Sequence, residues 1–390
     1  MWPFLYQTMG KIGPQAGNLL AGVLLVKYAG PSVFGQYTVA LAVFNLIFGT
    51  ISAALIIDYQ RNGKKEFFEL YTKHQFSFLL LFFPVTWITL VYLDLSGFSI
   101  LAIGIAVFGL KFSDLLSAKF RFNNKDIYSI LPRTLPIFAF CILLFLIKPE
   151  SIEYISAVFF ACWVVLSIAS ARPRAINLNG IRSALRKSND LKPLWLSLLC
   201  TQAFGGIDLV LIGRLGSDES VAIFKIGYTF ASFLMPIVSV LNFMFLTKIS
   251  TYKIPIGKKL KFDISLQTLF LCLIGFSGII FSFLIFPQFS NQLYGEIGGA
   301  AVEIVKILSF ALFFNMVGTV FSYILIFLKK DKMVFVINMA GALIYLLLTI
   351  LSIRYFGLVE VAYSMLIAHS VIMFFMLFVA LRFLRDSWEI

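Results

Sequence analysis

Long apolar runs recur along the whole chain, and short polar segments separate them. A helix needs ~20 apolar residues to cross the hydrocarbon core of a bilayer. A soluble domain carries about 25% charged residues, whereas only 13% of these 390 residues are charged and 60% are hydrophobic. Because so few polar side chains cannot cover a water-soluble surface, the sequence predicts an all-α polytopic membrane protein.

We predict twelve transmembrane helices from these runs. Their approximate limits are 12–29, 36–57, 75–93, 98–118, 131–147, 152–171, 193–213, 221–246, 264–286, 301–328, 333–353 and 358–381. The first run lacks the basic segment and cleavage site of a signal peptide, so we expect it to remain as a spanning helix. An even number of spans places both termini on the same side of the membrane.

The distribution of basic residues predicts the orientation of the spans. Of the 32 Lys and Arg residues, 25 fall in or at the edges of the termini and every second loop, four fall in or at the edges of the opposite loops, and three lie deeper within spans. Loops that are rich in Lys and Arg stay in the cytoplasm. This asymmetry predicts that both termini are cytoplasmic, and it explains the net charge of +13 without nucleic acid as a partner.

The longest basic loop, approximately 172–192, separates two sets of six spans. We therefore predict an N-terminal six-helix bundle with its following loop in residues 1–181 and a C-terminal six-helix bundle in residues 182–390. A repeated six-span unit is typical of transporters, in which the two halves rock to give alternating access.

Similar hairpins join the first two spans of each half. Gly30 matches Gly216, and Gly35 matches Ala222, at offsets close to half the chain. Glycine permits a tight turn, and a small residue lets two membrane helices meet closely. Coincidence remains an alternative explanation, because glycine is common in membrane hairpins.

Three segments carry a resemblance to a known family. They are AGPSVFGQYTVALAVFNLIFGTISAAL from residue 29, IDLVLIGRLGSDESVAIFKIGYTFASFLMPIVSVL from residue 207, and YFGLVEVAYSMLIAHSVIMFFMLFVALR from residue 355. They resemble the Wzx-type O-antigen and polysaccharide repeat-unit flippases, a branch of the multidrug/oligosaccharidyl-lipid/polysaccharide exporter superfamily. The resemblance implies two six-helix bundles that form a V around a central cavity.

The resemblance also implies a cargo and a pathway. The cargo is an undecaprenyl-diphosphate-linked oligosaccharide, which moves from the cytoplasmic to the outer leaflet of a bacterial inner membrane. The glycan then enters O-antigen, capsule or exopolysaccharide synthesis, with membrane lipids, a polysaccharide polymerase and the chain-length machinery as expected partners.

A diphosphate head group is anionic, so its path through the membrane should contain cations. Charged residues inside spans are costly and usually face a cavity or a charged partner. Lys225, which has no acidic residue one turn away, is the leading candidate to contact the head group, and Lys111, Lys306, Arg61 and Arg133 are the others. Lys225 snorkelling to the outer interface is an equally plausible interpretation. Ordinary positive-inside anchoring is an alternative for the two arginines.

Acidic residues inside the spans suggest local pairing or ion coupling. Asp114 lies three residues after Lys111, and Lys306 lies three residues after Glu303, so each pair shares a helix face and can neutralise itself. Asp208 follows two glycines in the seventh span and has no nearby basic residue. Asp208, Asp114 and Glu303 are candidates for binding Na⁺ or H⁺, while Asp208 could instead cap the chain beside the glycines.

The chain contains none of the short motifs that mark an enzyme, and we expect no catalytic residue, metal or organic cofactor. There is no P-loop, no H-E-x-x-H and no C-x-x-C, and the four cysteines lie within apolar runs. A drug or organic-cation efflux pump of the same fold is the first rival function, although such a pump would favour an acidic cavity. A polysaccharide polymerase is a second rival, and the short outer loops disfavour it.

Overall fold

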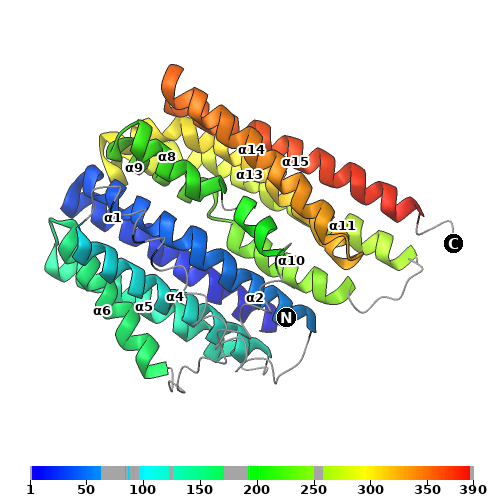
Figure 1. Cartoon of the computed structure of the whole chain (residues 1–390), viewed down its shortest axis with the longest axis horizontal. Coiled ribbons are helices and arrows are strands. Elements are labelled where there is room, and N and C mark those ends of the chain that lie inside the picture. The colour runs from blue at the N-terminus through cyan, green and yellow to red at the C-terminus, as the bar shows by residue number, and fades with distance from the viewer. Residues whose placement is uncertain are drawn as a thin grey trace. The chain divides into compact units, whose positions relative to one another are not determined.

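The computed structural model describes residues 2–62, 84, 87, 91, 96–122, 126–170, 192, 194–201, 203–249 and 258–386 (Figure 1). Every regular element in these described residues is a helix, with no strand. The chain forms two compact units, Met1–Ala222 and Ile223–Ile390. The expected boundary between residues 181 and 182 lies outside the described residues and stays a prediction.

The first unit is built around α1 and the helices that pack on it. Its elements are α1 (Trp2–Phe44), the π-helical segment η1 (Asn45–Gly49), α2 (Thr50–Asn62), α4 (Gly97–Phe122), α5 (Asp126–Ile147), α6 (Ile152–Ser170), the π-helical segment η2 (Ala203–Ile207) and α8 (Asp208–Leu215). Helix α1 contains the first predicted span and the start of the second. Gly30 divides them with a φ of 87°, a left-handed conformation that glycine adopts without a steric penalty.

Glycines bring α1 and α5 into close contact in a parallel arrangement. A Cβ atom at Gly13 would lie 3.2 Å from Thr134, and one at Gly17 would lie 2.7 Å from Ile137. One turn further along α5, the Cys141 thiol donates a hydrogen bond of 3.2 Å to the Gly17 carbonyl. Residue numbers rise together along the two helices. The segment of α1 before Gly30 is therefore parallel to α5.

The two matching hairpins meet within the first unit. Helix α9 begins at Asp218, whose carboxylate accepts hydrogen bonds from Gln36 Nε2 at 3.0 Å and Ser32 Oγ at 3.4 Å. A Cβ atom at Gly35 would collide with the main-chain carbonyl of Asp218. The absence of a side chain at Gly35 therefore allows the second segment of α1 to approach the start of α9.

The second unit is centred on α13. Its elements are the remainder of α9 (Asp218–Ala231), α10 (Met235–Ile249), α11 (Lys258–Ile280), the π-helical segment η3 (Phe281–Ile285), α12 (Phe286–Tyr294), α13 (Glu296–Phe327), α14 (Asp331–Tyr355) and α15 (Leu358–Asp386). Helix α13 packs against α10, α11, α12 and α15. Gly318 of α13 permits close contact with Met373 of α15.

The eighth predicted span is bent by 49° between α9 and α10. Pro236 lies in the first turn of α10 and has no N–H with which to continue the α9 hydrogen-bond ladder. The missing N–H therefore accounts for the end of the α9 ladder at this bend. In contrast, α5 continues as a single helix through Pro132 and Pro136.

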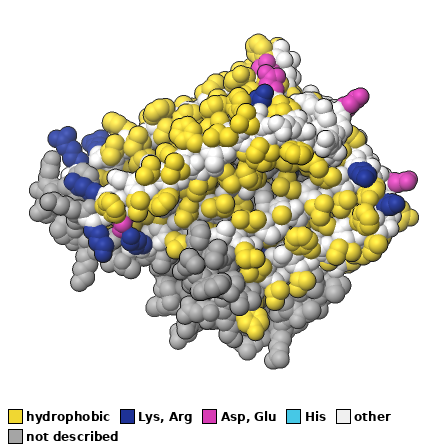
Figure 2. All heavy atoms as spheres, turned by 180° about the vertical axis from the view of Figure 1, so that it is seen from behind, with side chains coloured by type: hydrophobic (Ala, Val, Ile, Leu, Met, Phe, Trp, Pro, Cys, Tyr) yellow, Lys and Arg dark blue, Asp and Glu magenta, His cyan; other side chains and the backbone are white. Residues whose placement is uncertain are grey.

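Within the described residues, seven helices are long and apolar enough to cross a membrane, or nine if each of two bent pairs is one span. Most of the third predicted span, 75–93, lies outside the described residues. Large apolar side chains such as Leu347 (64% exposed) and Phe378 (67%) point away from the core of the second unit. Hydrophobic side chains dominate the face in Figure 2, and charged side chains lie towards its margins, as expected for a surface that contacts lipid.

The close contact at Gly35 can be tested by Gly35→Ala. We expect the added methyl to lower the free energy of unfolding by about 1–3 kcal/mol, the usual cost of overpacking, because the Asp218 carbonyl that it meets is backbone. Thermal unfolding in detergent measures the effect. Gly206→Ala is the matched control, because its Cβ would meet only Leu46 at 3.9 Å. Equal stability of the two variants would contradict the close contact.

Candidate functional site

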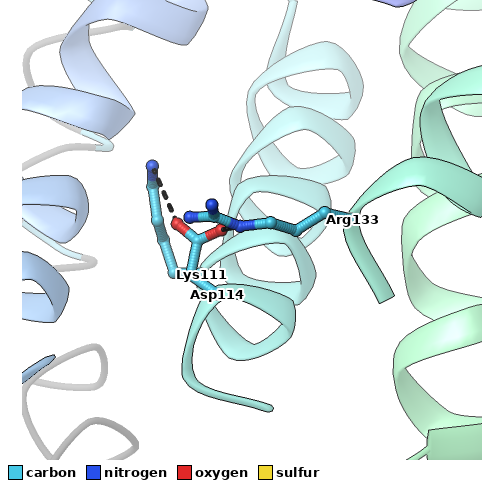
Figure 3. Close-up of polar contacts among 3 residues, drawn as sticks. All are labelled: Lys111, Asp114 and Arg133. Atoms are coloured by element: carbon cyan, nitrogen blue, oxygen red, sulfur yellow. Dashed lines mark hydrogen bonds and ion pairs between the residues drawn. The ribbon is translucent and has the colours of Figure 1, made fainter. Parts of the chain in front are cut away.

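Three charged side chains from α4 and α5 meet inside the first unit (Figure 3). Asp114 Oδ1 accepts a hydrogen bond from Arg133 Nε at 2.5 Å, and Asp114 Oδ2 lies 3.9 Å from Lys111 Nζ. The side chains of Lys111 and Asp114 are each 14% exposed and that of Arg133 is 22% exposed. We call these three residues the cationic cluster, since two positive charges share one carboxylate.

The cationic cluster contains one predicted pair and one contact that the sequence did not reveal. The spacing of Lys111 and Asp114 on one helix face predicts their pairing, which the structure confirms. Arg133 comes from a neighbouring helix, and its contact with Asp114 was missed. Two opposite charges near the facing ends of consecutive spans were the only available signal.

The Lys111 ammonium reaches the irregular segment η1. A Cβ atom at Gly49 would lie 3.4 Å from Lys111 Nζ and 3.8 Å from Asn45 Oδ1, so the ammonium occupies the space beside this glycine. π-helical turns occur frequently at functional sites. Segment η1 also contacts η2, where Leu46 approaches Gly206. The cationic cluster thus borders the place where the second and seventh spans both depart from α-helical geometry.

Asp208 stabilises the break in the seventh span. Gly205 has a φ of 80°, and the span bends by 74° around this point. The buried Asp208 carboxylate accepts hydrogen bonds from the Gly205 N–H at 2.9 Å and the Leu209 N–H at 2.8 Å. These contacts fit the capping interpretation, because main-chain donors freed inside a membrane need partners. The role of Asp208 in ion coupling stays a prediction.

The two candidate lysines of the second unit, Lys225 and Lys306, lie against aromatic rings. Lys225 Nζ is 6.0 Å from the centre of the Tyr228 ring, and Lys306 Nζ is 5.4 Å from that of Phe283. The expected ion pair between Glu303 and Lys306 is absent, so this prediction was wrong. The Lys306 side chain turns to the aromatic face instead, which attracts a cation electrostatically, and Glu303 is exposed.

Arg61 lies in the last turn of α2, and its side chain is outside the described residues. Its expected contact with a head group therefore stays a prediction.

Within the described part of the chain, no group of three His, Cys, Asp or Glu residues could hold a metal ion.

A buried polar network in the second unit was also missed. Asn242 of α10 donates to Thr319 of α13 at 2.8 Å and accepts a hydrogen bond from Gln267 of α11 at 3.2 Å. Near this network, Lys248 Nζ lies 2.7 Å from Asp263 Oδ1. The sequence offered little indication of this network, because spacing along one helix does not show which polar side chains of different helices meet. These contacts join three helices and satisfy their polar groups inside the membrane.

Charge balance in the cationic cluster predicts unequal effects of two substitutions. Asp114→Ala leaves two cations without their shared carboxylate and should lower the free energy of unfolding by about 3 kcal/mol. Lys111→Met leaves the Arg133–Asp114 pair intact and should cost much less. Thermal unfolding of the two purified variants measures the difference, and a greater loss in Lys111→Met would contradict the assigned pairing.

Comparison with known proteins identifies the fold. The family model MatE matches residues 193–351. An inward-facing multidrug resistance MATE family transporter of the MOP superfamily is 15% identical, with a TM-score of 0.72 and 96% of each chain covered. The lipid II flippase MurJ in an inward closed conformation is 15% identical, with a TM-score of 0.76 over 98% of this chain and 90% of that chain. No curated protein sequence matches significantly.

A third similar structure is a MOP superfamily transporter from Pyrococcus furiosus, described as having a binding pocket of reverse polarity that suggests a different function. It is 14% identical, with a TM-score of 0.66 over 98% of this chain and 95% of that chain. The likeness confirms the predicted fold class, because MATE-fold transporters consist of twelve helices in two bundles. The MatE match over residues 193–351 and the shared fold are therefore what the chain has in common with the transporters of the multidrug/oligosaccharidyl-lipid/polysaccharide exporter superfamily.

Proposed function

We propose that the chain is a flippase for a polyprenyl-diphosphate-linked oligosaccharide, and that it supplies a repeat unit for surface polysaccharide synthesis. The observation that carries this proposal is the cationic cluster. Lys111 and Arg133 hold two positive charges against the single negative charge of Asp114 within the helical bundle. A net positive charge among apolar helices favours an anionic cargo.

A diphosphate can interact with the cationic cluster without breaking the contact between Arg133 and Asp114. Arg133 contacts Asp114 through Nε, and its guanidinium has further N–H donors that suit phosphate oxygens. Lys111 Nζ lies at the longer distance of 3.9 Å from Asp114, so its interaction with the carboxylate is the weaker of the two. An incoming diphosphate could therefore recruit Lys111 first and leave the Arg133–Asp114 contact in place.

The fold itself is compatible with two kinds of transport, since both multidrug transporters and a lipid II flippase share it. The sign of the charge distinguishes them. An efflux pump for organic cations needs an acidic group that is available to the drug. In the first unit, Asp114 is balanced by two cations and Asp208 accepts two main-chain hydrogen bonds. This arrangement supports the flippase over the pump.

The positions of the cluster residues support uptake from the cytoplasmic leaflet. If both termini are cytoplasmic, as the basic loops predict, the end of α4 that bears Asp114 and the start of α5 that bears Arg133 lie towards the cytoplasmic side of a bacterial inner membrane. A cargo made in the cytoplasm would meet these charges early in its path. Coupling to Na⁺ or H⁺ through Asp208, Asp114 or Glu303 remains part of the proposal.

Complementation of a bacterial strain that lacks its repeat-unit flippase tests this function. Wild type should restore surface glycan, whereas Lys111→Ala and Arg133→Ala should reduce it about tenfold at equal membrane abundance, because each loses a charge-assisted contact. Lys225→Ala tests the leading lysine of the second unit in the same assay. Lys332→Ala is the control, since this exposed lysine lies outside the cluster.

Drug susceptibility in the same strains separates the two transport functions. The flippase proposal predicts restored glycan with unchanged susceptibility to organic cations. Drug resistance without glycan, across hosts that make different repeat units, would overturn the proposal in favour of efflux.

A further inference from the structure

Two lysines share one tyrosine ring at the end of the first unit opposite the cationic cluster. Lys27 Nζ lies 5.9 Å from the centre of the Tyr28 ring, and Lys148 Nζ lies 6.0 Å from the same centre. Both lysine side chains are exposed, and Tyr28 is half-buried. The two ammonium groups therefore lie within about 12 Å of each other, and both are close enough to the Tyr28 ring for a cation–π interaction.

The parallel packing of α1 and α5 brings these residues together. Gly17 sits beside Ile137, and Tyr28 and Lys148 follow the same register eleven residues further along each helix. Lys148 is fifteen residues beyond Arg133, which corresponds to about 22 Å along a helix axis. A bilayer core is ~30 Å thick, so the two groups of cations lie towards opposite interfaces.

Basic residues are scarce at this end of the bundle. The predicted orientation gives the outer loops only four of the 32 Lys and Arg residues, and Lys27 and Lys148 are two of these four. Within the part of the chain that the structure describes, neither lysine forms an ion pair. Two of the few outer cations thus gather at one ring, and no described carboxylate lies within ion-pair distance of either.

The backbone at Lys148 provides a second, independent observation. Its N–H closes the last turn of α5 by donating to the Leu144 carbonyl at 2.9 Å, and its φ is 49°. This left-handed position after a helix is usually occupied by Gly, which adopts it without strain. A lysine at this position carries a conformational cost and gains no ion pair, which suggests that its charge serves an interaction outside the chain.

We infer that Lys27, Tyr28 and Lys148 form a binding site for the phosphate of a lipid in the outer leaflet. A lipid phosphate lies at the depth where lysine and tyrosine side chains meet the head groups. One phosphate between the two ammonium groups would relieve their mutual repulsion, and the Tyr28 hydroxyl is an additional donor. Two sources share this chemistry: an anionic phospholipid, and the diphosphate of a translocated cargo, the latter resting on the proposed function.

Lipid binding to the purified full-length protein in detergent tests the site, with phosphatidylglycerol and undecaprenyl diphosphate as separate probes. We expect the double variant Lys27→Ala/Lys148→Gly to bind at least one probe about tenfold more weakly than wild type. Loss for phosphatidylglycerol identifies a phospholipid site, and loss for undecaprenyl diphosphate alone identifies a cargo site. Unchanged affinity for both probes would overturn the inference.

The chain provides a closely matched control in Lys329. This exposed lysine also has a positive φ, of 57°, but belongs to a predicted cytoplasmic loop. Both Lys148→Gly and Lys329→Gly should raise the unfolding temperature, because glycine relieves the backbone strain. Only Lys148→Gly should weaken lipid binding. Equal weakening by both substitutions would show a general effect of surface charge and would also overturn the inference.

Because phosphatidylglycerol is not the proposed cargo, the two proposals fail separately. Loss of glycan complementation with phosphatidylglycerol binding intact would count against the flippase alone. The side of the membrane is tested by labelling a Lys148→Cys variant in intact cells with a membrane-impermeant maleimide. Labelling above the wild-type background supports an outer site, and labelling only after permeabilisation would overturn it.

Discussion

The hydrocarbon core of a bilayer supplies no hydrogen-bond partner, and this constraint governs the whole chain. Main-chain groups must pair within helices, so each departure from a helix needs its own solution. Asp208 provides one by binding the N–H groups freed beside Gly205. Polar side chains need partners for the same reason, and the Asn242 amide finds them in Thr319 and Gln267 across three helices. Such polar contacts allow the bundle to bend without leaving polar groups exposed to lipid.

The same constraint makes each charge inside the membrane costly unless another group interacts with it. A cation inside the membrane is retained only when a partner or a cargo offsets its desolvation. Within the described residues, Asp114 is the carboxylate that both Lys111 and Arg133 pair with, so one carboxylate serves two cations. At the opposite end of the same bundle, the ammonium groups of Lys27 and Lys148 share only a tyrosine ring. Positive charge towards both interfaces suits a cargo whose phosphates begin and end their path at lipid head groups.

The sequence predicted the features that depend on local spacing. Apolar run lengths identified the helices, and the three-residue spacing paired Lys111 with Asp114. Contacts between distant segments could not be predicted, because spacing along one helix does not determine how two helices pack. The Arg133–Asp114 bond was missed for this reason. The same three-residue spacing wrongly predicted an ion pair between Glu303 and Lys306, because the Lys306 ammonium lies over the ring of Phe283 instead.

Transport by the purified protein in liposomes distinguishes a diphosphate-lipid flippase from an efflux pump. The measurement compares the flipping of a fluorescent undecaprenyl-diphosphate-linked oligosaccharide with the uptake of a fluorescent organic cation in the same vesicles. We expect flipping of the diphosphate lipid, slowed when Lys111 and Arg133 are both replaced by Met, and no uptake of the cation. Uptake of the cation without movement of the diphosphate lipid would contradict it.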